Sequence, residues 1–134
     1  MNMSKQLIQE YYNSFNEGDL NKFMSFLHEE IAHDINHTGR EIGKEKFLIF
    51  MKRMNDCYQE TIKNLIIMTD EDGQHAAAEF VVEGMYKKTD SGLPPAQGQT
   101  YTLSGGAFFE IKDNKIIRVT NYYNLNDWLK QINK

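Results

Sequence analysis

The sequence predicts an α+β fold in which helices cover one face of a mostly antiparallel sheet. Apolar residues recur every three to four positions from Ser4 to Tyr58, with one short strand as an interruption, and this is the period of amphipathic helices. From Thr61 to Tyr123 the period changes to two, and hairpin turns separate the segments. Helices that precede hairpin-connected strands are typical of α+β domains. A chain of 134 residues is long enough for one core, so we expect a single domain over residues 1–134.

Capping residues set the limits of the expected helices. The first helix runs over Ser4–Gly18 and ends at its glycine, and the second runs over Asp19–Glu30 from an aspartate cap. A third helix over Gly43–Tyr58 carries one apolar stripe. A final helix follows a cap at Asn124 or Asn126.

The strands are expected at Ile31–Asn36, Thr61–Thr69, Ala76–Lys87, Tyr101–Lys112 and Lys115–Tyr123. The segments Asp70–Gly73 and Asp113–Asn114 are tight turns, and Lys88–Gln99 is a long loop. Gly105–Gly106 predicts a bulge inside the sheet. Short helices over a twisted sheet leave a wedge between the two layers, which is a natural place for a ligand pocket.

Composition excludes several classes of function. The formal net charge is −4, and no cluster of four or more basic residues occurs, so neither a nucleic-acid surface nor an anionic-membrane surface is expected. The single cysteine, Cys57, excludes an internal disulfide and a cysteine-based zinc site. No apolar run resembles a signal peptide or a membrane span. We therefore expect a cytoplasmic protein with no metal ion and no cofactor.

Two segments carry a family resemblance. The segment Gln9–Leu20 (QEYYNSFNEGDL) is similar to the first helix, glycine stop and capping aspartate of ketosteroid isomerase. The ending Asn121–Leu125, followed by Trp128, resembles the SnoaL-like, ketosteroid isomerase-related branch of the nuclear transport factor two-like superfamily. The resemblance covers essentially the whole chain. It implies a cone-shaped fold whose helices pack on a strongly curved sheet and enclose a pocket, a fold that hosts isomerases, cyclases, hydrolases, dehydratases and non-catalytic binders.

The resemblance also implies catalytic residues. Isomerase chemistry of this kind uses a carboxylate base beside a carbonyl group and two donors to the enolate oxygen. Tyr11 matches one donor. Asp34 matches the base when the register is anchored on Gly43, whereas anchoring on the second helix gives Ile35. The second donor falls at Ala107, which cannot donate, so we expect poor steroid isomerase activity.

Alternation along the first strand leaves the direction of Asp34 open. One face carries Ile31, His33 and Ile35, and the other carries Ala32, Asp34 and Asn36. Asp34 therefore lines the wedge only if the polar set faces inward.

Asn121 is a third catalytic candidate. It shares one strand parity with Ile117 and Val119, and the family resemblance implies that this set faces inward. A polar group among apolar neighbours needs a hydrogen-bond partner. Asn121 or Tyr101 could replace the missing donor. The remaining ligand-binding candidates are His33, Asn36, Phe50, Met54, Phe80, Tyr101, Phe109 and Tyr123.

Two functions stay open at this point. The first is an isomerase- or cyclase-type enzyme that removes a proton next to a carbonyl of a hydrophobic substrate, with Asp34 as base and Tyr11 and Asn121 as polar partners. The second is a non-catalytic module that binds a hydrophobic small molecule in a cavity lined by Met51, Met54, Phe80, Val82 and Phe109. An inward Asp34 within reach of the ligand favours catalysis. A protein–protein adaptor is a third option.

Further features carry narrower hypotheses. His33 is a possible acid/base group beside Asp34, but His33 and His37 lack the third ligand that a metal site needs. Cys57 is either a structural thiol or a reactive thiol near Arg53. The outward strand row is rich in apolar groups and predicts a homodimer through the convex sheet face; its residues are Glu79, Val81, Glu83 and Met85, beside Phe108 and Tyr122.

Overall fold

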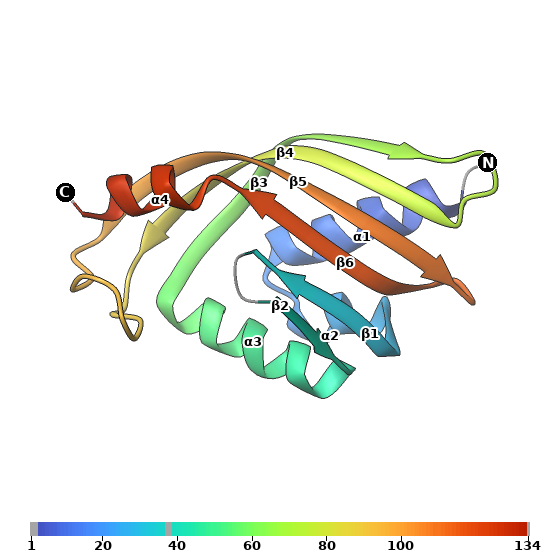
Figure 1. Ribbon diagram of the computed structural model, residues 1–134, viewed down its shortest axis with the longest axis horizontal. Coiled ribbons are helices and arrows are strands. Elements are labelled where there is room, and N and C mark those ends of the chain that lie inside the picture. Colours follow the sequence, from blue (N-terminus) through green and yellow to red (C-terminus); the bar gives the residue numbers. More distant parts are fainter. Residues whose placement is uncertain (1–2, 37–38, 134) are drawn as a thin grey trace.

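In the computed structural model, which describes residues 3–36 and 39–133, helices lie against a strongly curled sheet (Figure 1). The elements follow in the order α1 (Met3–Glu17), α2 (Leu20–Ser25), β1 (Leu27–Ile35), β2 (Gly39–Ile42), α3 (Lys44–Cys57), β3 (Tyr58–Thr69), β4 (His75–Tyr86), β5 (Gln99–Lys112), β6 (Lys115–Tyr123) and α4 (Leu125–Ile132). The sequence-based prediction of an α+β fold is thus confirmed. His37 and Thr38 lie outside the described residues.

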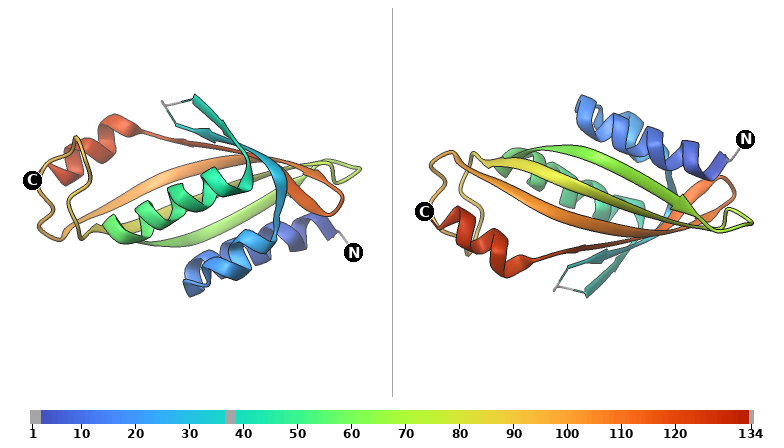
Figure 2. Two further views of the ribbon diagram at one scale, coloured as in Figure 1. Left: turned by 90° about the horizontal axis from the view of Figure 1, so that it is seen from below. Right: turned by 90° about the horizontal axis from the view of Figure 1, so that it is seen from above.

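The described strands form one six-stranded sheet in the order β2-β1-β6-β5-β4-β3. Neighbouring strands are antiparallel except β1 and β6, which are parallel. Helix α3 contacts β1 and β2 at one edge of the sheet and β3 at the other edge, so the sheet curls around it. Figure 2 shows α1, α2 and α3 in front of the sheet in the view from below. We call this helix-covered side the concave face and the opposite side the convex face.

Local capping residues set the end of α1 and the start of α2, but they do not set the end of α2. α1 ends before Gly18, whose φ of 75° is the left-handed conformation of a C-terminal glycine. The Asp19 side chain caps α2 by accepting from the Lys22 backbone N–H at 3.0 Å. The expected continuation of α2 to Glu30 is wrong, because the helix ends at Ser25 and Leu27 begins β1. Leu27 is buried there and pairs with Ile116, so pairing with β6 overrides the helical period.

Three further expectations about the strands need correction. β2 was not predicted, and it pairs with β1 through partners such as Asp34 and Arg40. Tyr58 belongs to β3 rather than to the apolar stripe of the third helix. Gly105–Gly106 forms no bulge, because both residues keep regular partners on β4. A shift of register instead occurs between Lys63 and Ile66, where Asn64 has a φ of 55°.

Two clusters of buried residues share the concave side. The main core joins α1, α2 and α3 to the middle of the sheet around Ile8, Phe47 and Phe109. The second cluster, which we call the aromatic end cluster, lies where α4 meets β3, β4 and β5. Its buried members are Cys57, Tyr58, Tyr86, Tyr101, Leu103 and Ile132, and Trp128 packs against them.

The alternation expected for β4 is confirmed. Phe80 and Tyr86 are buried on the concave face, whereas Glu79 and Glu83 are exposed on the convex face. None of the helices in the described part of the chain is long and apolar enough to cross a membrane.

Candidate functional site

A carboxyl group and a phenol meet on the concave face at the aromatic end cluster. Glu60 on β3 pairs with Gly84 on β4, and Gly84 pairs with Tyr101 on β5, so the three residues form one row across the sheet. The Tyr101 ring lies over Gly84, and its hydroxyl donates to Oε2 of Glu60 at 2.5 Å. The sheet register therefore joins two side chains that stand 41 positions apart in the sequence.

Burial controls the charge of this pair. It raises the pKa of Glu60 because the ionised carboxylate loses water, and the hydrogen bond from Tyr101 opposes that rise. The pKa of Tyr101 is also raised, first by burial and then by the Glu60 charge. Within the described residues Glu60 forms no ion pair. A partly buried carboxyl group whose pKa lies above its ordinary value is suited to proton transfer.

Aromatic side chains surround the pair. The Trp128 ring packs against Tyr101, Tyr58 and Tyr123 with centroid distances of 6.0, 5.8 and 6.5 Å. Helix α4, which carries Trp128, is tied to β5 because the Gln131 side chain exchanges hydrogen bonds of 2.9 and 3.0 Å with the Thr102 backbone. Burial raises the pKa of Tyr123, and the Glu60 charge adds to the rise. These contacts place Tyr101 and Tyr123, both predicted ligand-binding residues, beside a carboxyl group that the sequence analysis missed.

Asp34 lies in a different environment, on the convex face. Its carboxylate accepts from Nε and Nη2 of Arg40 at 2.6 and 3.0 Å and from the Thr120 hydroxyl at 2.6 Å. Arg118 extends the network by donating to Thr120 and to Glu110. Hydrogen bonds from Arg40 are the main reason why the pKa of Asp34 falls to about 2. The structure therefore separates Asp34 from the two groups predicted to work with it, Tyr11 and Asn121, which are on the concave side.

Tyr11, His33 and Asn121 all lie on the concave side of the sheet, and we call these three residues the inner centre. His33 is only 2% exposed, stacks on Phe47 at 4.2 Å, and has a pKa lowered by burial to about 4. Its Nδ1 is buried without a hydrogen-bond partner among the described residues. Asn121 is only half-buried, so water can reach its amide. A polar atom of a ligand would satisfy the buried Nδ1 of His33.

The inner centre and the Glu60–Tyr101 pair are separate places. Asn121 pairs with Ala107, which lies six positions along β5 from Tyr101, a strand distance of about 20 Å. One small substrate group cannot contact both. Only a ligand with an extended skeleton would reach from one to the other.

The apolar pocket expected around Tyr11, Phe80 and Phe109 is not confirmed. Tyr11 and Phe109 pack edge to face at 5.7 Å, and Tyr12 packs against Phe80 at 5.4 Å. Among the other predicted ligand-binding residues, Phe50 contacts His33 edge to face at 4.8 Å, and Met54 is half-buried beside the aromatic end cluster. The Asn36 amide donates to the backbone carbonyl of Tyr123 at 3.2 Å.

The sequence contained a signal for Glu60. It shares strand parity with Tyr58 and Ile62, so a charged residue occupies a position on the apolar face. The signal was lost because the expected strand began at Thr61, one residue too late. Nothing local marks Trp128 as its neighbour, because that contact depends on where α4 docks.

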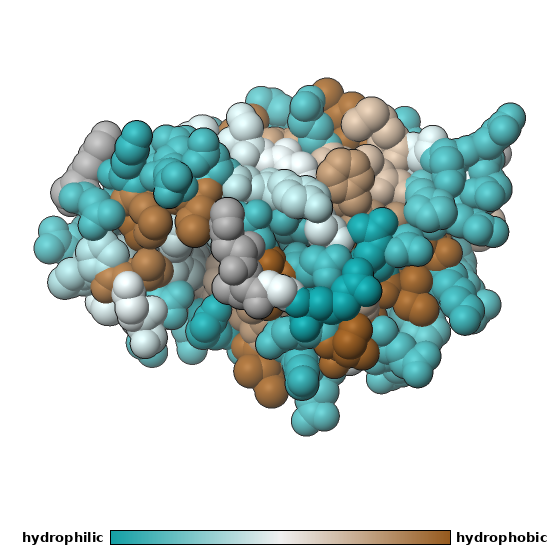
Figure 3. Space-filling model, in the orientation of Figure 1, coloured by the Kyte–Doolittle hydropathy of each residue, from teal (hydrophilic) through white to brown (hydrophobic). Residues whose placement is uncertain are grey.

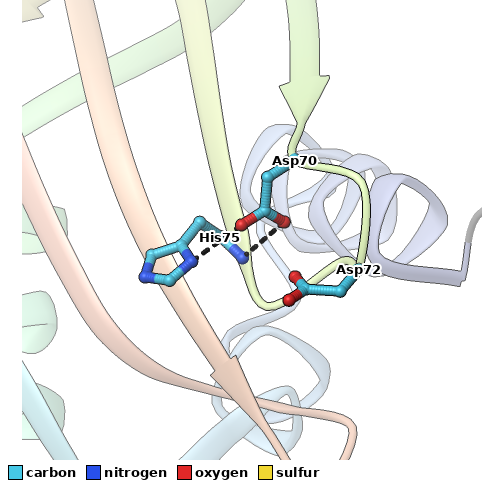
Figure 4. Close-up of side chains that lie close together, drawn as sticks. All are labelled: Asp70, Asp72 and His75. Carbon is cyan, nitrogen blue, oxygen red and sulfur yellow. Dashed lines mark hydrogen bonds and ion pairs between the residues drawn. The ribbon is translucent and has the colours of Figure 1, made fainter.

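Cys57 and a group of side chains at the β3–β4 turn need no functional explanation. Burial raises the pKa of the Cys57 thiol, which favours the structural interpretation of this residue. At the β3–β4 turn, Asp70, Asp72 and His75 lie close together and are all exposed (Figure 4). Asp70 accepts from the His75 backbone N–H at 3.1 Å and contacts its Nδ1 at 2.8 Å, so the turn itself accounts for this arrangement.

The convex face carries an open groove of about 930 Å³. Exposed apolar side chains line it, among them Ile66, Met68 and Phe108, which are 53%, 53% and 47% exposed. Figure 3 shows hydrophobic residues gathered over the upper side of the sheet in this view. Isolated exposed apolar residues are normal, but a contiguous group on one sheet face indicates an interaction surface.

Comparison with known proteins places the whole chain among proteins of one fold. The family model for the SnoaL-like domain matches residues 8–119. A proposed polyketide cyclase from Pseudomonas putida KT2440 is 50% identical, with a TM-score of 0.95 over 96% of this chain and 97% of that chain. A second proposed polyketide cyclase, from Xanthomonas campestris pv. campestris, is 48% identical, with a TM-score of 0.95 over 97% of this chain and 96% of that chain.

More distant similarity extends to the fold alone. An epoxide hydrolase of the LEH-like type from M. tuberculosis is 14% identical, with a TM-score of 0.77 over 97% of this chain and 89% of that chain. The comparison with curated proteins finds no match.

Proposed function

We propose that this chain, which belongs to the SnoaL-like domain family, binds a hydrophobic carbonyl compound and catalyses proton transfer next to the carbonyl group. Its similarity to two proposed polyketide cyclases supports a cyclase- or isomerase-type role. The observation that carries the reaction type is the half-buried Glu60 carboxyl group, which accepts a hydrogen bond from Tyr101 on the concave face.

In the proposed reaction Glu60 is the base. Its ionised carboxylate removes a proton from the carbon next to the carbonyl, and the electron pair of the broken C–H bond forms an enolate. Once Glu60 is protonated, its O–H can donate to the Tyr101 oxygen. That frees the Tyr101 hydrogen for the enolate oxygen, with Tyr123 as a second donor.

Two outcomes follow from the enolate. Glu60 can return the proton to a different carbon, which completes an isomerisation. Alternatively, the enolate carbon attacks a second carbonyl carbon of the same molecule and closes a ring; the π bond of that carbonyl opens, and its oxygen takes the proton from Glu60. The inner centre would bind a second polar group of an extended substrate through Tyr11, His33 and Asn121.

Asp34, the base implied by the family resemblance, is the second candidate. A carboxylate with a pKa of about 2 is a weak base at neutral pH, because Arg40 and Thr120 already stabilise its charge. Substitutions that remove the carboxylate charge, one at Glu60 and one at Asp34, therefore show which residue is the base.

The test is a comparison of Glu60→Gln with Asp34→Asn on β,γ-unsaturated ketones of increasing apolar size, with enone formation followed by ultraviolet absorption. General-base catalysis contributes about 10²–10⁴-fold, so Glu60→Gln should lose at least 100-fold in kcat/KM. Asp34→Asn should stay within about 3-fold of the parent. The reverse pattern would identify Asp34 as the base. A 3-oxo-Δ5-steroid belongs in the panel as a test of the poor steroid isomerase activity expected from the sequence.

Binding without catalysis is the alternative, and the aromatic end cluster allows it to be measured. Trp128 is the only tryptophan in the chain and packs on Tyr101. If the ketones quench Trp128 fluorescence saturably but the parent protein converts none of them, the chain is a small-molecule binding module.

We also propose that the convex face joins two copies of the chain in a homodimer. The exposed apolar side chains of the groove, among them Ile66, Met68 and Phe108, support this proposal.

A further inference from the structure

We propose that Gly84 is a positioning residue whose missing side chain lets Tyr101 reach across β4 to Glu60. This inference rests on the proposed function only where the pair is used in catalysis. The contact itself can be tested without a substrate.

The space above Gly84 is fully occupied by the Tyr101 ring. A Cβ atom built on Gly84 would lie 2.3 Å from Cζ, 2.4 Å from Cε2 and 2.6 Å from the hydroxyl oxygen of Tyr101. These distances are far below van der Waals contact, and they fall at the end of the ring that carries the hydrogen bond. Alanine at this position would therefore displace the phenol.

The backbone offers no other reason for a glycine here. Gly84 is absent from the described glycines that have positive φ, and it lies within a regular antiparallel strand. A glycine inside a strand weakens the sheet and often marks a close approach of another group. At Gly84 that group is the Tyr101 ring.

Contact between Tyr101 and Glu60 across β4 requires a long side chain on β5 and no side chain on the β4 residue between them. Tyr101 and Glu60 lie on strands separated by β4, about 10 Å apart. A tyrosine side chain that stood upright on β5 could not contact β3. Only a ring that lies flat over the intervening residue brings its hydroxyl to the carboxylate at 2.5 Å.

The consequence concerns the proton on Glu60. Within the described residues, the titratable groups that face it are Tyr101 from β5 and Tyr123 from β6, with Tyr58 beside it on β3. The Tyr101 hydrogen bond favours the ionised carboxylate, and burial opposes it. When the phenol is displaced, burial alone remains and the pKa of Glu60 rises.

The same sheet face provides a matched control. Gly105 lies under the Phe80 ring, and a Cβ there would lie 2.6 Å from Cε1 of Phe80. Gly105→Ala thus imposes a similar clash on an apolar ring that carries no hydrogen bond. It should destabilise the protein without changing the titration of Glu60.

The experiment is an NMR titration of protein labelled with ¹³C at glutamate side-chain carboxyls, with the Glu60 signal assigned by its loss in Glu60→Gln. We expect Gly84→Ala and Tyr101→Phe each to raise the pKa of Glu60 by about one unit. The double variant should show no further rise, and Gly105→Ala should show none. An unchanged Glu60 pKa in Gly84→Ala, or additive shifts in the double variant, would overturn the proposal.

A second measurement covers the case in which Gly84→Ala does not fold. Tyr101→Ala removes the ring, so adding Gly84→Ala to Tyr101→Ala should leave the melting temperature of Tyr101→Ala nearly unchanged. A large further loss of stability on adding Gly84→Ala would overturn the proposal. If the Glu60 pKa shifts as expected while Glu60→Gln keeps full activity, the positioning role stands and the proposed base is wrong.

Discussion

The two faces of the sheet provide opposite environments for ionisable groups. On the concave face burial favours the neutral forms, so the pKa of Glu60 is raised and that of His33 is lowered to about 4. On the convex face Asp34 is surrounded by Arg40 and Thr120, and its pKa falls to about 2. His33 and Asp34 are adjacent in the sequence. Neighbouring residues of one strand therefore lie in different environments: His33 is desolvated, whereas Asp34 is paired with a cation.

The difference bears on function. A carboxyl group whose pKa burial has raised is a better proton acceptor, whereas a carboxylate held by a guanidinium group keeps its charge. The concave face is thus suited to proton transfer. On the convex face, the charged network and the apolar groove are suited to structure and association.

The largest expected effect is on the association of two chains through the convex face. If the convex face pairs two copies, Ile66→Lys buries an unpaired charge in the interface and should weaken the dimer by at least about 100-fold. Ile49 on α3 is 64% exposed and does not line the groove, so Ile49→Lys is the matched control and should leave the dimer intact. Light scattering at micromolar concentration measures both. A parent protein of 15.7 kDa in solution would contradict the proposed dimer.

The next effect is a pH dependence of stability that arises from His33. Its pKa is about 4 in the folded protein and 6.5 when unperturbed, so the unfolded chain binds more protons between these values. Stability should therefore fall by about 3 kcal/mol as the pH drops from 6.5 through 4. Urea unfolding across this range measures the slope.

His33→Leu tests the assignment of that slope. The variant has no titratable group at this position and should lose most of the dependence between pH 6.5 and 4. It also removes the buried Nδ1 that lacks a partner, so its stability at pH 7 should change by less than about 1.5 kcal/mol. An unchanged slope would show that another group titrates. Weaker ketone binding by His33→Leu would support the role of the inner centre.

The smallest effect is expected from the convex network. Thr120→Val keeps the side-chain shape but removes the hydrogen bond to Asp34, which should cost about 1–2 kcal/mol at pH 7. It should also raise the pKa of Asp34 toward 3.8. The stability that Asp34 contributes above pH 4 is lost as the pH falls through about 2, and the variant should show less of this loss. A parallel measurement of ketone isomerisation should find activity unchanged, and a large loss would favour Asp34 as the base.

Local chemistry in the sequence determined most of the elements. The glycine stop and aspartate cap at Gly18 and Asp19 separate α1 from α2, as expected. Asp113 and Asn114, with φ values of 53° and 62°, form the tight turn between β5 and β6. The alternation of β4 identified which of its residues share a face. Each of these features depends on a few consecutive residues, so the sequence alone is sufficient to predict it.

The tertiary structure decided which face is the inside. Alternation places His33 and Asp34 on opposite faces but is equally satisfied by either assignment, because a strand has no intrinsic inner side. The packing of α3 turned His33 inward onto Phe47. Pairing of β2 with β1 places Arg40 beside Asp34 on the convex face. The same holds for Glu60 and Tyr101, which meet only because the register of three strands aligns them across Gly84. Such contacts depend on which elements pack together, and no local pattern encodes that choice.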